Sequence, residues 1–69
     1  MMTDKTILRM SAVMSRTGLA RSSIYDKISK GEFPKPINLG RRAVGWVADE
    51  VETWIQDRID ESRPSHQAA

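Results

Sequence analysis

Apolar residues recur at helical spacing near the start of the chain and predict a short first helix from about residue 11 to residue 17. Its inner side carries Met10, Val13, Met14 and Thr17. Ser11 is placed to cap this helix, because a serine hydroxyl accepts a hydrogen bond from a first-turn backbone N–H. Gly18 ends it, since glycine enters the left-handed region without strain.

The same spacing predicts a second helix from Arg21 to Lys30, with Ile24 and Ile28 one turn apart on its buried side. A rotation of about 100° per residue puts four polar residues on the opposite, outward side. They are Ser22, Ser23, Asp26 and Lys30. Tyr25 and Lys27 lie on the flanks, and Gly31 stops the helix. Two helices joined by a glycine turn form a helix-turn-helix.

After Pro36 the apolar period changes to two, which is typical of strands. Residues 37–39 and 44–47 are predicted to pair as a hairpin around a turn at residues 40–43. A hairpin this short is not stable alone and must pack on the helices. Arg41 and Arg42 project from its turn. Residues 7–8 are expected to pack onto the core as a short apolar segment.

A last helix is predicted from Asp49 to Glu61, with Asp49 as its N-cap or as a first-turn acid. Its inner stripe consists of Val51, Trp54, Ile55 and Ile59. Trp46 and Trp54 are in phase with neighbouring apolar positions, so we interpret both as core residues rather than base-stacking platforms. Phe33 is predicted to fill the core as well.

These elements predict a mainly α protein with a small β-hairpin: a winged helix-turn-helix of three helices and a two-stranded wing. We expect the domain to cover residues 7–62, between a flexible N-terminus (1–6) and a disordered tail (63–69).

With 69 residues, no cysteine and only His66 as histidine, the chain offers no disulfide framework and no metal ligand set. Its apolar runs are too short for a membrane span, so we expect a cytoplasmic, nucleoid-associated protein without cofactor or catalytic residues.

The net charge of +2 hides an asymmetry along the chain. Residues 1–47 hold nine Lys or Arg against three Asp or Glu, whereas residues 48–69 hold two against six. A basic face backed by an acidic helix suggests an anionic partner on one side. We therefore expect double-stranded DNA as the partner.

In a helix-turn-helix the second helix lies in the major groove, where its side chains reach base edges. The residues predicted to contact DNA from this helix are Arg21, Ser22, Ser23, Tyr25, Asp26, Lys27 and Lys30. Arg41 and Arg42 are predicted to contact the backbone or the minor groove from the wing. Tyr25 stays open between packing on the helix flank and reaching a phosphate.

Three ordered motifs resemble the AlpA family of phage-type transcriptional regulators. They are Arg-Thr-Gly-Leu-Ala-Arg-Ser-Ser-Ile-Tyr, Glu-Phe-Pro-Lys-Pro, and Val-Gly-Trp followed by Glu-Val-Glu-Thr-Trp-Ile, within about residues 7–59. Members resemble MerR regulators and phage excisionases, which implies a prophage or mobile-element regulator that activates integrase expression or directs excision. Two positions depart from the family pattern: Ala20 replaces a common serine, and Asp26 replaces a usual basic residue.

Two other functions fit the same residues. The first is an architectural excisionase that bends DNA and contacts an integrase through the acidic last helix, around Glu52, Asp57 and Asp60. The second is a protein-only adaptor or anti-repressor. A single small module covers a limited DNA interface, so we also expect a homodimer or a cooperative array on repeated sites, with an integrase or RNA polymerase as a further partner.

Overall fold

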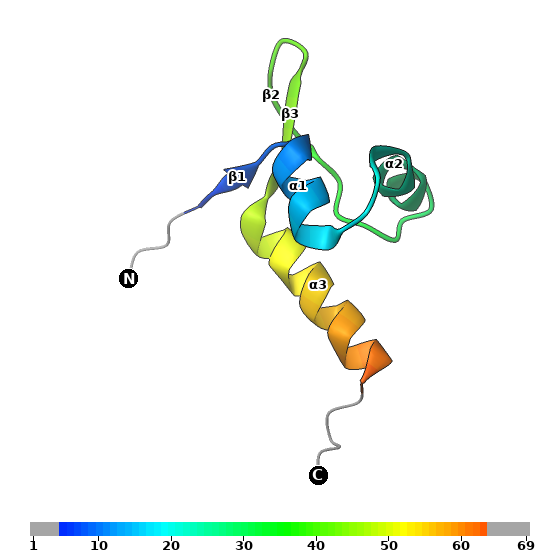
Figure 1. Ribbon diagram of the computed structural model, residues 1–69. Helices are drawn as coiled ribbons and strands as arrows, with labels where there is room; N and C mark the ends of the chain where they lie inside the picture. Colours follow the sequence, from blue (N-terminus) through cyan, green and yellow to red (C-terminus); the bar gives the residue numbers. More distant parts are fainter. Residues whose placement is uncertain (1–4, 64–69) are drawn as a thin grey trace.

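A computed structural model of the chain describes residues 5–63. Its elements, in chain order, are β1 (Ile7–Leu8), α1 (Met10–Thr17), α2 (Arg21–Ser29), β2 (Ile37–Gly40), β3 (Ala43–Val47) and α3 (Ala48–Ser62). Figure 1 shows the β2–β3 hairpin protruding as a finger, with α2 to one side of α1 and α3. The predicted class, three helices with a two-stranded wing, is confirmed. Most of the expected flexible terminus and tail, residues 1–4 and 64–69, lies outside the described residues.

The core lies where the three helices meet the base of the sheet. Its buried side chains are Leu8, Val13, Ile24, Phe33, Trp46 and Val51. Trp46 is fully buried and Trp54 packs against the cluster from α3, so the interpretation of both tryptophans as core residues is confirmed. The prediction for Ile59 was wrong: this residue is 39% exposed. In Figure 1 the C-terminal part of α3 extends beyond α1, and no other helix covers it there.

Residues 7–8 form a strand that the sequence pattern did not predict. The sheet has the order β1–β3–β2, and β1 pairs antiparallel with β3 through Ile7 opposite Val47 and Leu8 opposite Trp46. Gly45 allows this approach, because a Cβ added there would lie 2.5 Å from Cγ2 of Ile7. The backbone N–H of Ala48 also donates to the Thr6 carbonyl oxygen at 2.8 Å. Two residues are too few to display a period, which is why the strand was missed.

The predicted Ser11 cap was wrong, and of the two roles left open for Asp49 the first-turn acid is confirmed. Helix α1 begins at Met10 with Arg9 as its N-cap, and no side chain caps it. Arg9 is extended and its carbonyl oxygen already accepts from the N–H of Val13, which places Ser11 inside the helix. Helix α3 follows β3 directly, with Val47 as its N-cap, so Asp49 is a first-turn acid and not the cap.

Candidate nucleic-acid interface

The outward face of α2 is polar and exposed because Ile24 anchors the opposite side in the core. Ser22, Asp26 and Lys30 follow one another at intervals of four residues, so they form a single column along this face. Ser29 stands beside the column and is exposed as well. Ser29 was not among the predicted residues, although the same helical rotation places it on the outward side.

Asp26 and Lys30 are joined in this column. The Lys30 ammonium lies 3.1 Å from a carboxylate oxygen of Asp26, and both side chains are 59% exposed. The hydrogen bond to Asp26, together with the charges of Asp26 and Glu32, raises the pKa of Lys30 above its usual value. The ammonium is therefore charged throughout the physiological pH range. The Ser29 hydroxyl donates to the Asp26 carbonyl oxygen at 2.8 Å.

The remaining α2 residues predicted to contact DNA take different positions. Tyr25 is 45% exposed and Arg21 is exposed at the start of the helix. Ser23 is half-buried at the edge of the outward face. Lys27 is half-buried too and lies on the flank that faces α3, where it lines a groove.

The start of α2 has no side-chain cap. Its N-cap is Ala20, and its first turn contains no acidic residue. The nearby Thr17 hydroxyl is already engaged, because it donates to the Val13 carbonyl oxygen at 2.8 Å and accepts from the Leu19 N–H at 3.2 Å. The first N–H groups of α2 therefore have no side-chain acceptor among residues 5–63.

The turn of the hairpin presents both wing arginines to solvent. Gly40 pairs with Ala43, so Arg41 and Arg42 form the connection and both are exposed. Arg42 has a φ of 58°, a left-handed conformation that an arginine adopts only at a cost. Within residues 5–63, neither arginine forms an ion pair.

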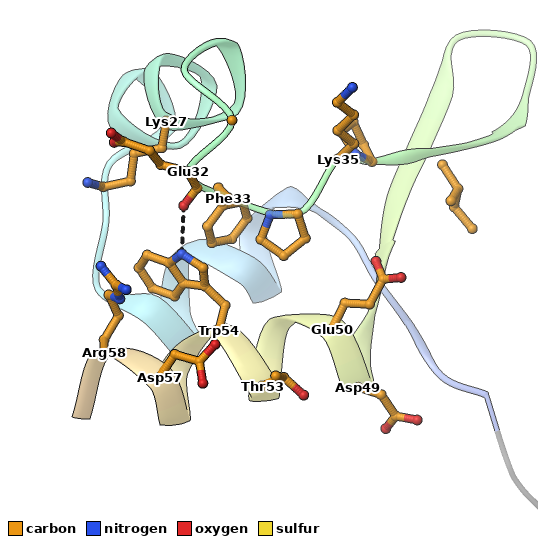
Figure 2. A pocket seen from close by; sticks show the side chains of 14 residues that line it. Lys27, Glu32, Phe33, Lys35, Asp49, Glu50, Thr53, Trp54, Asp57 and Arg58 are labelled. Atoms are coloured by element: carbon orange, nitrogen blue, oxygen red, sulfur yellow. Dashed lines mark hydrogen bonds between the residues drawn. The ribbon is translucent and has the colours of Figure 1, made fainter. Parts of the chain in front are cut away.

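Both tryptophan side chains form hydrogen bonds to the loop that connects α2 to the hairpin. The Trp46 indole N–H donates to the Pro34 carbonyl oxygen at 3.0 Å, and the Trp54 indole N–H donates to the Glu32 carbonyl oxygen at 2.7 Å. Figure 2 shows the second bond beside Phe33, whose ring meets that of Trp54 edge to face at 4.9 Å. The core position of both tryptophans was predicted, but their hydrogen bonds to the loop were not, because the acceptors are backbone atoms.

A groove runs between this loop and α3 (Figure 2). Asp49, Glu50 and Asp57 line its α3 side, together with Arg58. Lys27 and Lys35 line the other side. No group of three or more His, Cys, Asp or Glu that could hold a metal ion occurs among residues 5–63. No helix in this range is long and apolar enough to cross a membrane.

The family model described as "Prophage CP4-57 regulatory protein (AlpA)" matches residues 6–59, which include both helices of the helix-turn-helix, the hairpin and most of α3. The chain belongs to the AlpA family. The resemblance drawn from the three sequence motifs is thereby confirmed.

Two known proteins are similar to the chain. The chain is 46% identical to the uncharacterized protein ORF88 of Enterobacteria phage P4, over 83% of this chain and 65% of that protein. It is 40% identical to the DNA-binding transcriptional activator AlpA of Escherichia coli (strain K12), over 75% of this chain and 83% of that protein. The chain therefore spans slightly less than two thirds of the phage P4 relative.

Proposed function

We propose that this AlpA-family protein is a sequence-specific regulator of transcription that binds double-stranded DNA. In this proposal α2 lies in the major groove and the hairpin is a wing against the backbone or the minor groove. The observation that carries it is the uncovered, polar outward face of α2 together with two exposed wing arginines that have no ion-pair partner within residues 5–63. The relative from Escherichia coli, named as a DNA-binding transcriptional activator, supports it.

The shapes of the side chains suit this docking mode. Ser22 and Ser29 on the outward face are small, and such side chains allow a helix to approach base edges closely. The wing arginines carry long cationic side chains that reach phosphate oxygens and fix the protein on the duplex. The loop that Trp46 and Trp54 bind joins α2 to the wing. These hydrogen bonds therefore fix the position of α2 relative to the wing, and both elements contact DNA in this proposal.

The prophage family and the relative from phage P4 support a role in a mobile element. Within that role we infer control of integrase or excision genes, in the bacterial cytoplasm. A single domain of this size covers little DNA, so we also infer a homodimer or cooperative binding to repeated sites.

The groove beside α3 favours a second candidate, an architectural excisionase. Its acidic α3 side is a surface on which an integrase or RNA polymerase could dock while α2 and the wing hold DNA. Glu52 contributes less to such a surface than the sequence indicated, because it forms an ion pair with Arg16. An excisionase bends its site, so a measured bend in a bound duplex separates this function from simple regulation.

A salt titration tests DNA binding itself. If about five cations meet phosphates, log K should fall with log salt concentration at a slope of roughly −4 to −5. Fluorescence anisotropy with a labelled random duplex gives this slope directly. A slope near zero would contradict the proposal and favour the protein-only adaptor, whose apolar contacts depend little on salt.

A further inference from the structure

The centre of the outward face of α2 is occupied by one ion pair. Asp26 and Lys30 stand in the column that begins with Ser22, and their charged atoms are 3.1 Å apart. The neighbours Ser23 and Ser29 are small. The other two ion pairs among residues 5–63 join Arg16 to Glu52 and Arg58 to Glu61, and neither lies on α2. A carboxylate and an ammonium held together thus stand in the middle of the face that the proposed function turns to the major groove.

We propose that the Asp26–Lys30 pair reads one C·G base pair. The Asp26 carboxylate accepts a hydrogen bond from cytosine N4, and the Lys30 ammonium donates to O6 or N7 of the paired guanine. This assignment rests on the proposed function and names the base-pair specificity of the same site.

The donor and acceptor pattern of the two side chains matches that base pair. In the major groove, cytosine presents the N4 donor, and its guanine presents the O6 and N7 acceptors beside it. An ionised carboxylate only accepts and an ammonium only donates. A carboxylate has about four lone-pair sites, so Asp26 can keep its bond to Lys30 while it accepts from the base.

Desolvation makes the carboxylate selective. When α2 enters the groove, Asp26 loses water and needs a donor in its place, since a buried charge without a partner is costly. Base edges that present acceptors at this point are rejected. An A·T pair offers the adenine N6 donor, but it replaces the two guanine acceptors with thymine O4 and a methyl group. Lys30 then has a poorer partner, which favours C·G.

Selection of binding sites from a random synthetic duplex library tests the proposal. Wild type should fix a C·G pair at one position of the site. Replacing that pair with A·T should weaken binding by about 10-fold to 100-fold. Asp26→Asn should shift this position toward A·T, because an asparagine amide pairs with adenine N6 and N7, and should leave the other positions unchanged. Lys30→Met should lower the preference for C·G while the helix stays folded.

Glu61→Gln is the matched control. It removes the same charge from an exposed intrahelical ion pair, with the Glu61 side chain 65% exposed, on a different helix. It should leave the selected sequence unchanged. If Asp26→Asn instead strengthens binding to all duplexes equally and selects the wild-type sequence, Asp26 only repels phosphate and the assignment is wrong. Failure of wild type to bind any duplex would contradict the proposed function itself, which separates the two results.

Discussion

Arginines on two sides of the molecule differ in what holds them. Arg16 on α1 forms an ion pair with Glu52, and Arg58 on α3 forms one with Glu61 while it also lies over the Trp54 ring at 5.4 Å. On the α2 and hairpin side, Arg21, Arg41 and Arg42 form no ion pair with any residue in the range 5–63. Among residues 5–63, Arg16 and Arg58 are thus neutralised, whereas Arg21, Arg41 and Arg42 are available, as are Arg9 before α1 and Arg63 after α3.

This difference separates the arginines that stabilise the fold through an ion pair from the arginines that remain free to contact phosphate. A cation that already contacts a carboxylate has little to gain from a phosphate, whereas an exposed cation without a partner gains a charge-assisted contact and releases counterions from DNA. Net charge alone does not separate these classes, because every arginine counts equally in it. Among the arginines, the ion-pair pattern therefore separates Arg16 and Arg58 from those available to DNA, which the charge asymmetry of the sequence does not do.

The largest expected effect comes from neutralising the wing. The double variant Arg41→Gln, Arg42→Gln should weaken binding to all duplexes alike by about 10-fold to 100-fold and make the salt slope shallower by about 2. Sequence preference should stay the same, since a wing on phosphate carries little base information. Anisotropy titrations at several salt concentrations measure both quantities.

The matched control for the wing is Arg16→Gln, Arg58→Gln, which removes the same charge from the two arginines that form ion pairs. It should change DNA affinity by no more than about 3-fold. Equal losses from the two double variants would mean that only total charge matters, and the contrast between the two sides would be wrong.

The starts of α2 and α3 extend the contrast to helix ends. Neither helix has a side-chain cap, but α3 has Asp49 and Glu50 in its first turn and α2 has no acid there. Ala20→Ser should supply an acceptor for the α2 N–H groups and stabilise the fold by about 0.5–2 kcal/mol. In a domain of this size that raises the melting temperature by several degrees.

Ser11→Ala is the control for this capping prediction. Ser11 is exposed inside α1 and caps nothing, so its removal should change stability by less than about 0.5 kcal/mol. Thermal melts followed by circular dichroism compare the three proteins. An unchanged midpoint for Ala20→Ser would show that water already satisfies the N–H groups of α2.

The sequence predicted the elements that repeat a clear period. Ile24 and Ile28 oriented α2 correctly, and the alternation around residues 40–43 located the hairpin. The spacing of apolar residues did not predict the structure correctly where an element was short, or where a helical residue was exposed. Strand β1 has two residues, and Ile59 continues the helical stripe of α3 although it is 39% exposed.

The candidate site was predictable only where contacts are local. The Asp26–Lys30 pair follows from spacing by four residues on a helix. The Arg16–Glu52 pair joins residues 36 apart, and no local pattern indicates it. The two tryptophan bonds end on backbone carbonyl oxygens, which every residue possesses. Long-range partners of this kind depend on how the helices pack.

A smaller effect is expected from the backbone of the wing. Arg42 has a φ of 58°, and glycine adopts this conformation without steric cost. Arg42→Gly should therefore stabilise the fold by up to about 1 kcal/mol while it weakens DNA binding. Arg41→Gly removes the same charge at the neighbouring position, whose φ is not positive, and should not stabilise. Urea denaturation of both variants tests this, and equal stability changes would contradict the role of the left-handed position.

The smallest effect is expected for the ion pair between α1 and α3. The Arg16 and Glu52 side chains are 47% and 52% exposed, so their interaction should stabilise the fold by only about 0.2–1 kcal/mol. A double-mutant cycle of Arg16→Gln and Glu52→Gln isolates this energy. At about 1 M salt the Debye length falls to roughly 3 Å, and the coupling should largely disappear.

Glu52→Gln also leaves Arg16 without its partner, so it should strengthen binding to all duplexes slightly and equally. A change in sequence preference with this variant would place α1 against the bases and contradict the assignment of α2 to the groove.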